Sequence, residues 1–333
     1  MKRVLILLLT LLMIWSCSGS LPDWYNNREE YFPEKDYIAS KGWGATPEKA
    51  IEQATINMAQ TFSTHITVEK NILERYESIS NMKNITENLY EYSEETARLI
   101  SNQNLVNIHF VEPVWDRKSK SFYTLGYMKR SETARILMDR MEREQENIKY
   151  YVRMAYGTNN AVEKYHYYTT AWLTTGRNKM MYEQLEVLVP GIGIKPIYTF
   201  AELGVLKDKV AKDIRFIISV EGDANGKIKQ ALRTAVNAAG FTTVEKNGLL
   251  GIRAKALIKN VDIDQKPLAF VSWELQLKMS NHQNATSLSM MEEGREGSTN
   301  AENAKMHAFE RMQGVIEDEF QLKLMEYFDK LEK

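Results

Sequence analysis

One glycine-rich stretch, residues 222–227, lies between a predicted strand and a predicted helix, where a phosphate-binding loop would lie. A Walker loop has four residues between its glycines and a serine or threonine directly after its lysine. Here three residues separate Gly222 from Gly226, and Ile228 follows Lys227. We therefore interpret the stretch as a turn in which an aspartate or asparagine caps the following helix.

Residue types that bind metals do not occur at ligand spacings. The five histidines form no HExxH or comparable pattern, and we interpret each as an ordinary side chain: His65, His109, His166, His282 and His307. The acidic residues Glu292, Glu293 and Glu296 lack the regular oxygen spacing of an EF-hand loop, so we predict a solvated loop there. The sequence also contains no Gly-x-Ser-x-Gly nucleophile motif. It therefore predicts no catalytic residue, no metal site and no cofactor.

The chain has one cysteine, Cys17, which follows an apolar N-terminal segment. Lys2 and Arg3 precede this segment, which is apolar from residue 4 to residue 15 except for Thr10. A positive start followed by a short apolar run is typical of a secretory signal peptide. The run is too short to span a bilayer well as a helix. We therefore predict a signal peptide over residues 1–16.

The end of this segment, residues 14–17, resembles the lipobox of bacterial lipoproteins, although Trp15 departs from the small or aliphatic residue usual there. In that family the signal is cut before the cysteine, whose thiol and new amino group are acylated. The resemblance implies cleavage between Ser16 and Cys17 and lipidation of Cys17 by fatty acids such as palmitate. Ser18 stands where lipoproteins of the inner membrane often carry aspartate, which favours the outer membrane. The alternative is an ordinary secreted protein in which Cys17 has no role.

The composition is that of a folded protein with an ordinary surface. Charged residues make up 26% of the chain and hydrophobic residues 44%, as in soluble globular domains. The net charge of −1 argues against nucleic acid as a partner, because nucleic-acid-binding proteins carry concentrated basic surfaces. With Cys17 acylated, no thiol remains for disulfides, metals or nucleophilic catalysis.

Periodicity predicts an α+β fold of two related, small two-layer units, each a sheet with packed helices, joined by a helical connector. The expected segments are a signal peptide at 1–16, a lipidated tether at 17–22, an N-terminal α+β domain at 23–130, a helical connector at 131–190 and a C-terminal α+β domain at 191–333. Because the tether is short, we expect the N-terminal domain to lie close to the membrane.

The N-terminal domain is expected to begin with a strand at 37–39 that ends at Gly44, followed by a helix with Thr46 as N-cap and Pro47 as first residue. One side of that helix is apolar and partly small, which suits close packing on a sheet: Ala50, Ala54, Met58 and Phe62. Further elements are predicted as a strand at 66–72, a helix at 84–101, a strand at 106–110, a turn at 116–120 and a strand at 122–128.

Residues 131–189 have a helical pattern, which glycine is expected to interrupt at 157–160 and at Gly176. This connector is rich in aromatic residues: Tyr150, Tyr151, Tyr156, Tyr165, Tyr167, Tyr168, Trp172 and Tyr182. We interpret these rings as packing between helices rather than as a ligand-binding surface.

The C-terminal domain has the clearest alternation of apolar and polar residues. It predicts strands at 214–220, 241–244, 252–258 and 269–279. A helix is predicted over 228–236, with Gly240 as its stop, and a long closing helix over 302–326.

Residues 44–50 align with residues 298–304 at a constant offset. Beyond these segments the apolar positions of the two helices coincide: Ala54 with Ala308, Met58 with Met312, Phe62 with Ile316 and Ile66 with Phe320. A glycine follows the strand-like sequence before each helix, Gly42 in one and Gly294 in the other. We interpret the alignment as an internal repeat of a strand–glycine–helix element.

Three segments stand out in the N-terminal domain: Asp-Trp-Tyr at 23–25, the strand and glycines at 37–44, and the helix that contains Ala50 and Ala54. Together they resemble the LPP-twenty family of bacterial outer-membrane lipoproteins, whose relatives include flagellum-associated envelope lipoproteins. The resemblance covers residues 23–128. It implies an envelope-facing structural or assembly component and supplies no catalytic residue.

The sequence thus favours a non-enzymatic lipoprotein, held at the membrane by its N-terminal lipid, that binds envelope proteins or a second copy of itself. Surface or flagellar association is an expectation of the same resemblance. A periplasmic regulator of cell-wall synthesis is the alternative, but it would need a longer tether than residues 18–22. A hydrolase is a third hypothesis, which would need a catalytic pocket.

Overall fold

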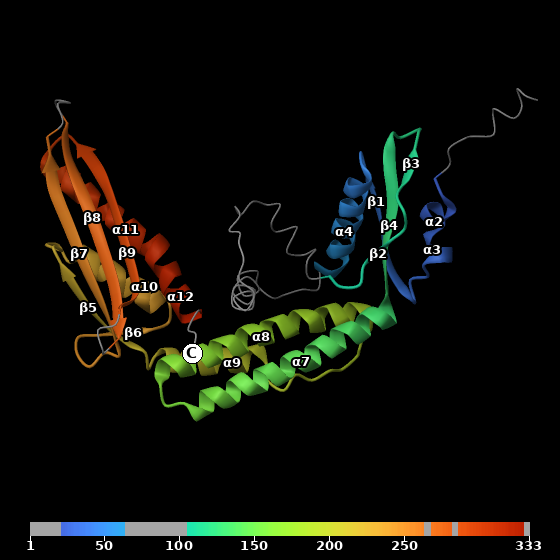
Figure 1. Ribbon diagram of the computed structural model, residues 1–333, viewed down its shortest axis with the longest axis horizontal. Helices are drawn as coiled ribbons and strands as arrows, with labels where there is room; N and C mark the ends of the chain where they lie inside the picture. The colour runs from blue at the N-terminus through green and yellow to red at the C-terminus, as the bar shows by residue number, and fades with distance from the viewer. Residues whose placement is uncertain (1–20, 64–104, 263–267, 282–285, 330–333) are drawn as a thin grey trace, which may run out of the picture. The chain divides into compact units, whose positions relative to one another are not determined.

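The structure is a computed structural model with an α+β fold, as predicted (Figure 1). It describes residues 21–63, 105–262, 268–281 and 286–329. The chain forms two compact units, which are described one at a time. Among the described residues, the first unit comprises 21–63, 105–144 and 178–195, and the second comprises 145–177, 196–262, 268–281 and 286–329.

The sheet of the first unit is antiparallel. Its strands are β1 (Tyr37–Gly44), β2 (His109–Phe110), β3 (Val114–Asp116) and β4 (Ser121–Lys129). β4 pairs with the other three, and β3 and β4 form a hairpin through the predicted turn. Asp116 closes this turn by accepting hydrogen bonds from the backbone N–H of Ser119 at 2.9 Å and from its hydroxyl at 2.7 Å. These bonds lower the pKa of the Asp116 carboxyl, so it is ionised at neutral pH.

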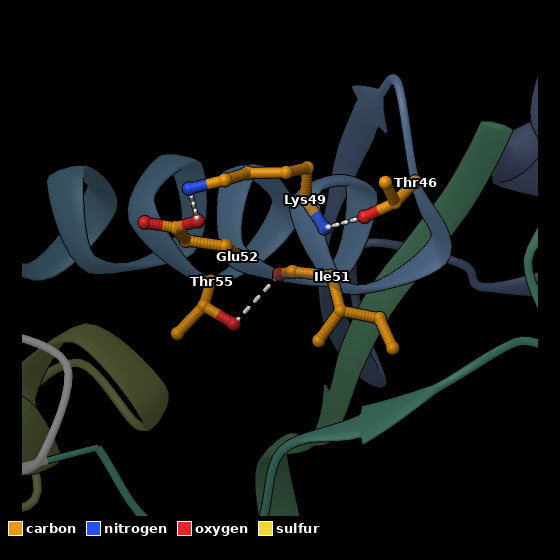
Figure 2. Close-up of polar contacts among 5 residues, drawn as sticks. All are labelled: Thr46, Lys49, Ile51, Glu52 and Thr55. Carbon is orange, nitrogen blue, oxygen red and sulfur yellow. Dashed lines mark hydrogen bonds and ion pairs between the residues drawn. The ribbon is translucent and has the colours of Figure 1, made fainter. Parts of the chain in front are cut away.

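Helix α4 (Pro47–Ser63) packs on one face of this sheet. Its N-terminus follows the prediction, because the backbone N–H of Lys49 donates to Thr46 Oγ1 at 3.3 Å (Figure 2). Figure 2 also shows an ion pair of 2.8 Å between Lys49 Nζ and Glu52 Oε2. The predicted apolar side is buried against the sheet: Ala50, Ala54, Met58 and Phe62.

Gly42 allows the backbones of β1 and α4 to come into close contact. A Cβ at Gly42 would overlap the carbonyl oxygen of Ala50. It would also lie 2.5 Å from the backbone N of Ala54 and 2.6 Å from its Cβ. The small residues predicted to bring this helix close to a sheet therefore do so.

The opposite face of the sheet carries two short helices, α2 (Asp23–Asn26) and α3 (Arg28–Tyr31). Tyr25 of α2 is buried, and its ring meets the ring of Tyr123 edge to face with centres 5.0 Å apart. The Lys41 ammonium lies 4.7 Å from the centre of the Tyr25 ring. The chain is thus packed on the sheet from its first described helix onward.

The strand predicted at 106–110 is wrong in length. Only His109 and Phe110 pair with β4, as β2. Asn107 has a φ of +61°, a left-handed conformation that interrupts an extended strand. The strand predicted at 66–72 and the helix predicted at 84–101 lie outside the described residues.

Two long helices follow β4 in the chain, α7 (Arg130–Gly157) and α8 (Ala161–Leu188). They are separated at 158–160, where the break is predicted. The break predicted at Gly176 is wrong, because α8 continues through this residue. Gly176 is buried, and the helix penalty of glycine, about 1 kcal/mol, is small beside the packing of a whole buried turn.

The sheet of the second unit has five strands in the order β6-β5-β7-β8-β9. They are β5 (Arg215–Glu221), β6 (Thr242–Val244), β7 (Leu250–Val261), β8 (Ala269–Asn281) and β9 (Thr286–Ser298). β5 pairs parallel with β6 and β7, whereas β8 pairs antiparallel with β7 and β9. The first four match strands predicted by their alternation, and β9 contains the strand-like sequence that the proposed repeat places before Gly294.

Helices cover one face of this sheet (Figure 1). They are α10 (Lys227–Ala238), α11 (Ala301–Val315), one π-helical turn (Ile316–Phe320) and α12 (Gln321–Asp329). The predicted apolar side of α10 is buried: Ile228, Ala231, Leu232, Ala235 and Val236. In the closing helix every fourth residue is buried: Ala304, Ala308, Met312, Ile316, Phe320, Leu324 and Phe328. Both helix predictions are therefore confirmed.

Helix α9 (Phe200–Ala211) is not predicted from the apolar pattern. Its start is a capping box formed by Thr199 and Glu202. The backbone N–H of Glu202 donates to Thr199 Oγ1 at 3.2 Å, and the backbone N–H of Thr199 donates to Glu202 Oε2 at 2.8 Å. The spacing Thr-x-x-Glu is a helix-start signal that the sequence contains.

The two helices of the proposed repeat are equivalent in their packing, whereas the two glycines are not. β1 and β9 each pair with a single strand and lead into a helix that packs on the same sheet. Helix α4 packs closely against Gly42, whereas the ring of Trp273 packs over Gly294. A Cβ at Gly294 would lie 2.6 Å from Trp273 Cζ2. The two segments thus share the order of strand and helix, but the glycine has a different role in each.

Candidate functional surfaces

The predicted cleavage and lipidation residues, Ser16 and Cys17, lie outside the described residues, so their modification stays a prediction. The described chain starts at Leu21, whose carbonyl accepts a hydrogen bond of 3.0 Å from Asn26 Nδ2. Within the described part of the chain, none of the helices combines the length and apolar composition needed to cross a bilayer.

The glycine-rich stretch at 222–227 is a turn, and a side chain of this turn accepts hydrogen bonds from backbone N–H groups at the start of α10. Gly222 has a φ of +81°, which favours glycine. The carboxylate of Asp223 accepts hydrogen bonds from the backbone N–H of Ile228 at 3.2 Å and of Lys229 at 2.9 Å. A phosphate would need N–H groups at the same helix start. The turn interpretation is therefore confirmed: Gly226 is the N-cap residue of α10, and Asp223, three residues before it, supplies the capping carboxylate.

Asp223→Ala is expected to lower the free energy of unfolding by about 1 kcal/mol, because the start of α10 loses its acceptor. Asp223→Asn should retain part of the stability, since its single amide oxygen can accept one of the two bonds whereas its NH₂ group cannot accept the other. Urea denaturation followed by circular dichroism measures the difference. Asn225→Ala, in the same turn, is the matched control. Equal losses for Asp223→Ala and Asn225→Ala would contradict the capping role.

The described histidines lie in three separate elements: His109 in β2, His166 in α8 and His307 in α11. His166 Nδ1 is hydrogen-bonded at 3.1 Å to the carbonyl oxygen of Phe328, which ties α8 to α12 within the second unit. His65 and His282 lie outside the described residues. Among the residues that the structure describes, no three His, Cys, Asp or Glu side chains are grouped closely enough to hold a metal ion.

The acidic residues predicted to form a solvated loop lie instead in β9, which corrects that prediction. Alternation along the strand places Glu292 and Glu296 on the helix-covered face and Glu293 on the open face. The prediction fails because β9 pairs with β8 along nearly its whole length, and this pairing outweighs the polar composition. The three carboxylates are therefore not directed to one centre.

The open face of the second sheet has a shallow pocket of about 260 Å³. Its lining comes from three neighbouring strands: Leu257, Lys259, Ser272, Trp273, Glu274, Glu293, Gly294 and Arg295. Glu274 and Glu293 are directly opposite each other in the β8–β9 register. Lys259 and Arg295 lie in the adjacent row, so the charges in the pocket balance. The pocket offers polar contacts but no histidine, cysteine or serine–histidine pair for catalysis.

Three tyrosines of α8 pack inside the second unit, in agreement with the interhelical interpretation, whereas Tyr150 and Tyr156 of α7 are exposed and do not follow it. Tyr165, Tyr167 and Tyr168 are buried. The ring of Tyr165 lies 5.2 Å from that of Phe241 and 5.5 Å from that of Phe328, measured between centres. Burial, reinforced by the neighbouring Tyr156, raises the pKa of Tyr168 to about 12, so this phenol is protonated at physiological pH.

No protein-family model matches the chain, and no curated protein matches its sequence. The LPP-twenty resemblance of residues 23–128 therefore stays a prediction. Solved structures do resemble the chain at low identity. One is a secreted protein from the human pathogen Helicobacter pylori, with 10% identity and a TM-score of 0.45 over 85% of this chain and 97% of that one.

Two further solved structures are described as lipoproteins, and each matches about a third of the chain. A minor lipoprotein from Acinetobacter baumannii has 10% identity and a TM-score of 0.26 over 35% of this chain and 90% of that one. Rare lipoprotein B from Shewanella oneidensis has 9% identity and a TM-score of 0.25 over 34% of this chain and 93% of that one. At these TM-scores we draw no functional conclusion from the three structures.

Proposed function

We propose that this protein is a non-enzymatic lipoprotein of the bacterial cell envelope, anchored by lipid on Cys17, with a structural or assembly role. The observation that carries the proposal is the position of the only cysteine, directly after a positive start and a short apolar segment. Each buried CH₂ of an acyl chain stabilises membrane attachment by about 0.8 kcal/mol, and stable anchoring takes more than one chain. A lipoprotein cysteine carries several.

The short distance between the cysteine and the folded body supports this proposal. Helix α2 starts at Asp23, six residues after Cys17, and Tyr25 is already packed on the first sheet. Six extended residues span at most about 20 Å, so the first unit would lie at the membrane surface. A regulator that crosses the periplasm to reach a cell-wall synthase would need a longer tether.

We further propose an outer-membrane location and partners within the envelope, including other copies of the chain. Ser18 and the LPP-twenty resemblance of residues 23–128 motivate this part of the proposal. Sizing of detergent extracts and cross-linking in whole cells would test it. A strictly monomeric protein that cross-links to no envelope protein would contradict an assembly role.

The anchor is tested by the intact mass of the protein purified from bacterial membranes. We expect the mass of residues 17–333 plus acyl groups. Cys17→Ala should lack the acyl mass and should retain the signal segment or leave the membrane fraction. Cys17→Ser, which keeps the size of the side chain, serves as the matched second variant. A mature wild-type protein without acyl mass would contradict the proposal.

A further inference from the structure

Both tryptophans that are exposed in the described chain lie at one end of the first sheet. Trp43 of β1 is 52% exposed, and Trp115 of β3 is 45% exposed. Val114, next to Trp115, is 40% exposed. Large apolar side chains that are grouped at the surface mark sites of interaction. We use the name aromatic tip for these three residues together with the cations of the adjoining turn: Arg117, Lys118 and Lys120.

Strand register brings these residues, far apart in the sequence, into two adjacent rows. Trp43 and Val114 both pair with Tyr123 of β4, so the three side chains share one face. Trp115 pairs with Phe122, on the opposite face, and their ring centres are 4.9 Å apart. Exposed apolar side chains therefore project from both faces at the end of the sheet. This geometry suits contact with a surface that the sheet meets end-on.

The turn between β3 and β4 gives the aromatic tip an excess of positive charge. Its three cations are exposed, and Asp116 is the one acidic residue of the turn. The Asp116 carboxylate is directed into the turn by its hydrogen bonds from Ser119. Glu48 and Glu112 are exposed acidic residues on the neighbouring segments. The cations therefore dominate the charge of the turn itself, beside the exposed rings.

The same part of the sheet fixes the start of the folded body. Tyr25 packs on Tyr123, the residue that pairs with both Trp43 and Val114. Tyr25 is eight residues after Cys17, and eight extended residues span at most about 28 Å. A lipid on Cys17 would hold the aromatic tip close to the bilayer.

We propose that the aromatic tip contacts the anionic phospholipid surface in which the acyl chains of Cys17 are embedded. This inference rests on the proposed lipid anchor. Tryptophan favours the membrane interface, where its ring meets apolar chains and its N–H meets polar headgroups. Lysine and arginine are attracted to anionic headgroups. A protein pocket would bury the rings alone, whereas an anionic bilayer surface satisfies both the rings and the cations.

The test uses the full chain purified from bacterial membranes, with its intact mass recorded, in phosphatidylcholine vesicles with or without phosphatidylglycerol. Brominated acyl chains in the phosphatidylcholine quench the fluorescence of tryptophans that contact lipid. We expect Trp43→Phe/Trp115→Phe to lose about half of the quenching or more, because the interfacial rings are removed. Lys118→Glu/Lys120→Glu should reduce the quenching in vesicles that contain phosphatidylglycerol, and less in those that lack it.

Two matched variants control for charge and for tryptophan number. Lys35→Glu/Lys129→Glu makes the same charge change at the opposite end of the sheet, where Lys129 pairs with Tyr37. Trp172→Phe removes a tryptophan of the second unit. Both should retain the quenching of the wild type. The lysine variants lie on exposed positions, so circular dichroism should show the wild-type fold even if the tryptophan variant loses stability.

The outcomes separate the tip from the anchor. Acylated protein that is quenched equally with and without Trp43 and Trp115 would overturn the tip contact and leave the anchor intact. Protein without acyl mass whose tip tryptophans are still quenched would support the tip contact and contradict the anchor. A loss of quenching in Lys35→Glu/Lys129→Glu as large as in Lys118→Glu/Lys120→Glu would overturn the assignment to this end of the sheet. Cross-linking of the tip to an envelope protein without quenching would assign it to a protein partner instead.

Discussion

Gly42→Val is expected to destabilise the first unit by about 3 kcal/mol. A Cβ at this position would overlap the carbonyl oxygen of Ala50 and lie 2.5 Å from the backbone N of Ala54. Both are backbone atoms of α4, so rotation of a side chain cannot relieve the overlap. The helix must move away from β1, and the close packing of its buried side is lost.

Hydrogen exchange followed by mass spectrometry measures this change in each unit separately. We expect faster exchange in β1 and α4, with the sheet of the second unit as the internal reference. Gly314→Ala in α11 is the matched control, because a Cβ there meets no atom within 4 Å. It should stabilise the helix by about 0.5 to 1 kcal/mol. Unchanged exchange in β1 and α4 of Gly42→Val would contradict the close contact.

Phe328→Ala is expected to destabilise the second unit by about 3 to 5 kcal/mol. Phe328 is 1% exposed. Its ring centre lies 4.4 Å from that of Phe241, 5.5 Å from that of Tyr165 and 6.4 Å from that of Phe216. The substitution would leave a cavity where α8, α12 and the sheet meet, which smaller neighbours cannot fill without moving these elements.

Urea denaturation and hydrogen exchange in β5 and β6 measure this loss. Leu322→Ala removes a large apolar side chain from the same helix, but Leu322 is 65% exposed. It should change the free energy of unfolding by less than about 0.5 kcal/mol. Phe328→Leu, which fills most of the space, should be less costly than Phe328→Ala. Similar midpoints for Phe328→Ala and Leu322→Ala would contradict the proposed role of this ring in the core.

Elements whose apolar pattern matches their burial could be predicted from the sequence. β8 alternates because one face lies on the helices and the other is open, and α4 shows one apolar side for the same reason. β9 does not alternate in this way, because its covered face holds Glu292, Gly294 and Glu296. The ring of Trp273 from the neighbouring strand occupies the space over Gly294. At Gly294 the covered face of β9 is thus filled by an apolar side chain from β8, so the sequence of β9 itself shows no apolar residue there.

Two further differences arise from the balance of local and tertiary effects. Gly176 is a local helix breaker that lies in a buried stretch of α8, where packing decides the length of the helix. Helix α9 is short, and its predictive signal is the capping box of Thr199 and Glu202 rather than a long apolar pattern.

The candidate functional residues differ in how far the sequence alone can reveal them. The lipidation of Cys17 stays a prediction, and the sequence alone can make it, because the lipobox is a short linear segment that does not depend on the fold of the rest. The aromatic tip cannot be predicted in this way, because its residues come from β1, β3 and a turn, and only the pairing with β4 places Trp43 and Val114 in one row, on either side of Tyr123. Surfaces of this second kind require the register of the sheet.

The π-helical turn at Ile316–Phe320 corrects the phase of the closing helix. Buried residues recur at every fourth position from Ala304 to Phe328. Since an α-helix turns about 100° per residue, each step of four would advance the buried side by about 40°, and six steps by about 240°. The π turn holds one extra residue, which reduces this total rotation by about 100°. The buried residues therefore stay within an arc of about 140° around the helix axis. Deletion of one residue from this turn would therefore turn it into ordinary α-helix and leave Leu324 and Phe328 facing the sheet, because the deleted residue is the one that the wider turn absorbs.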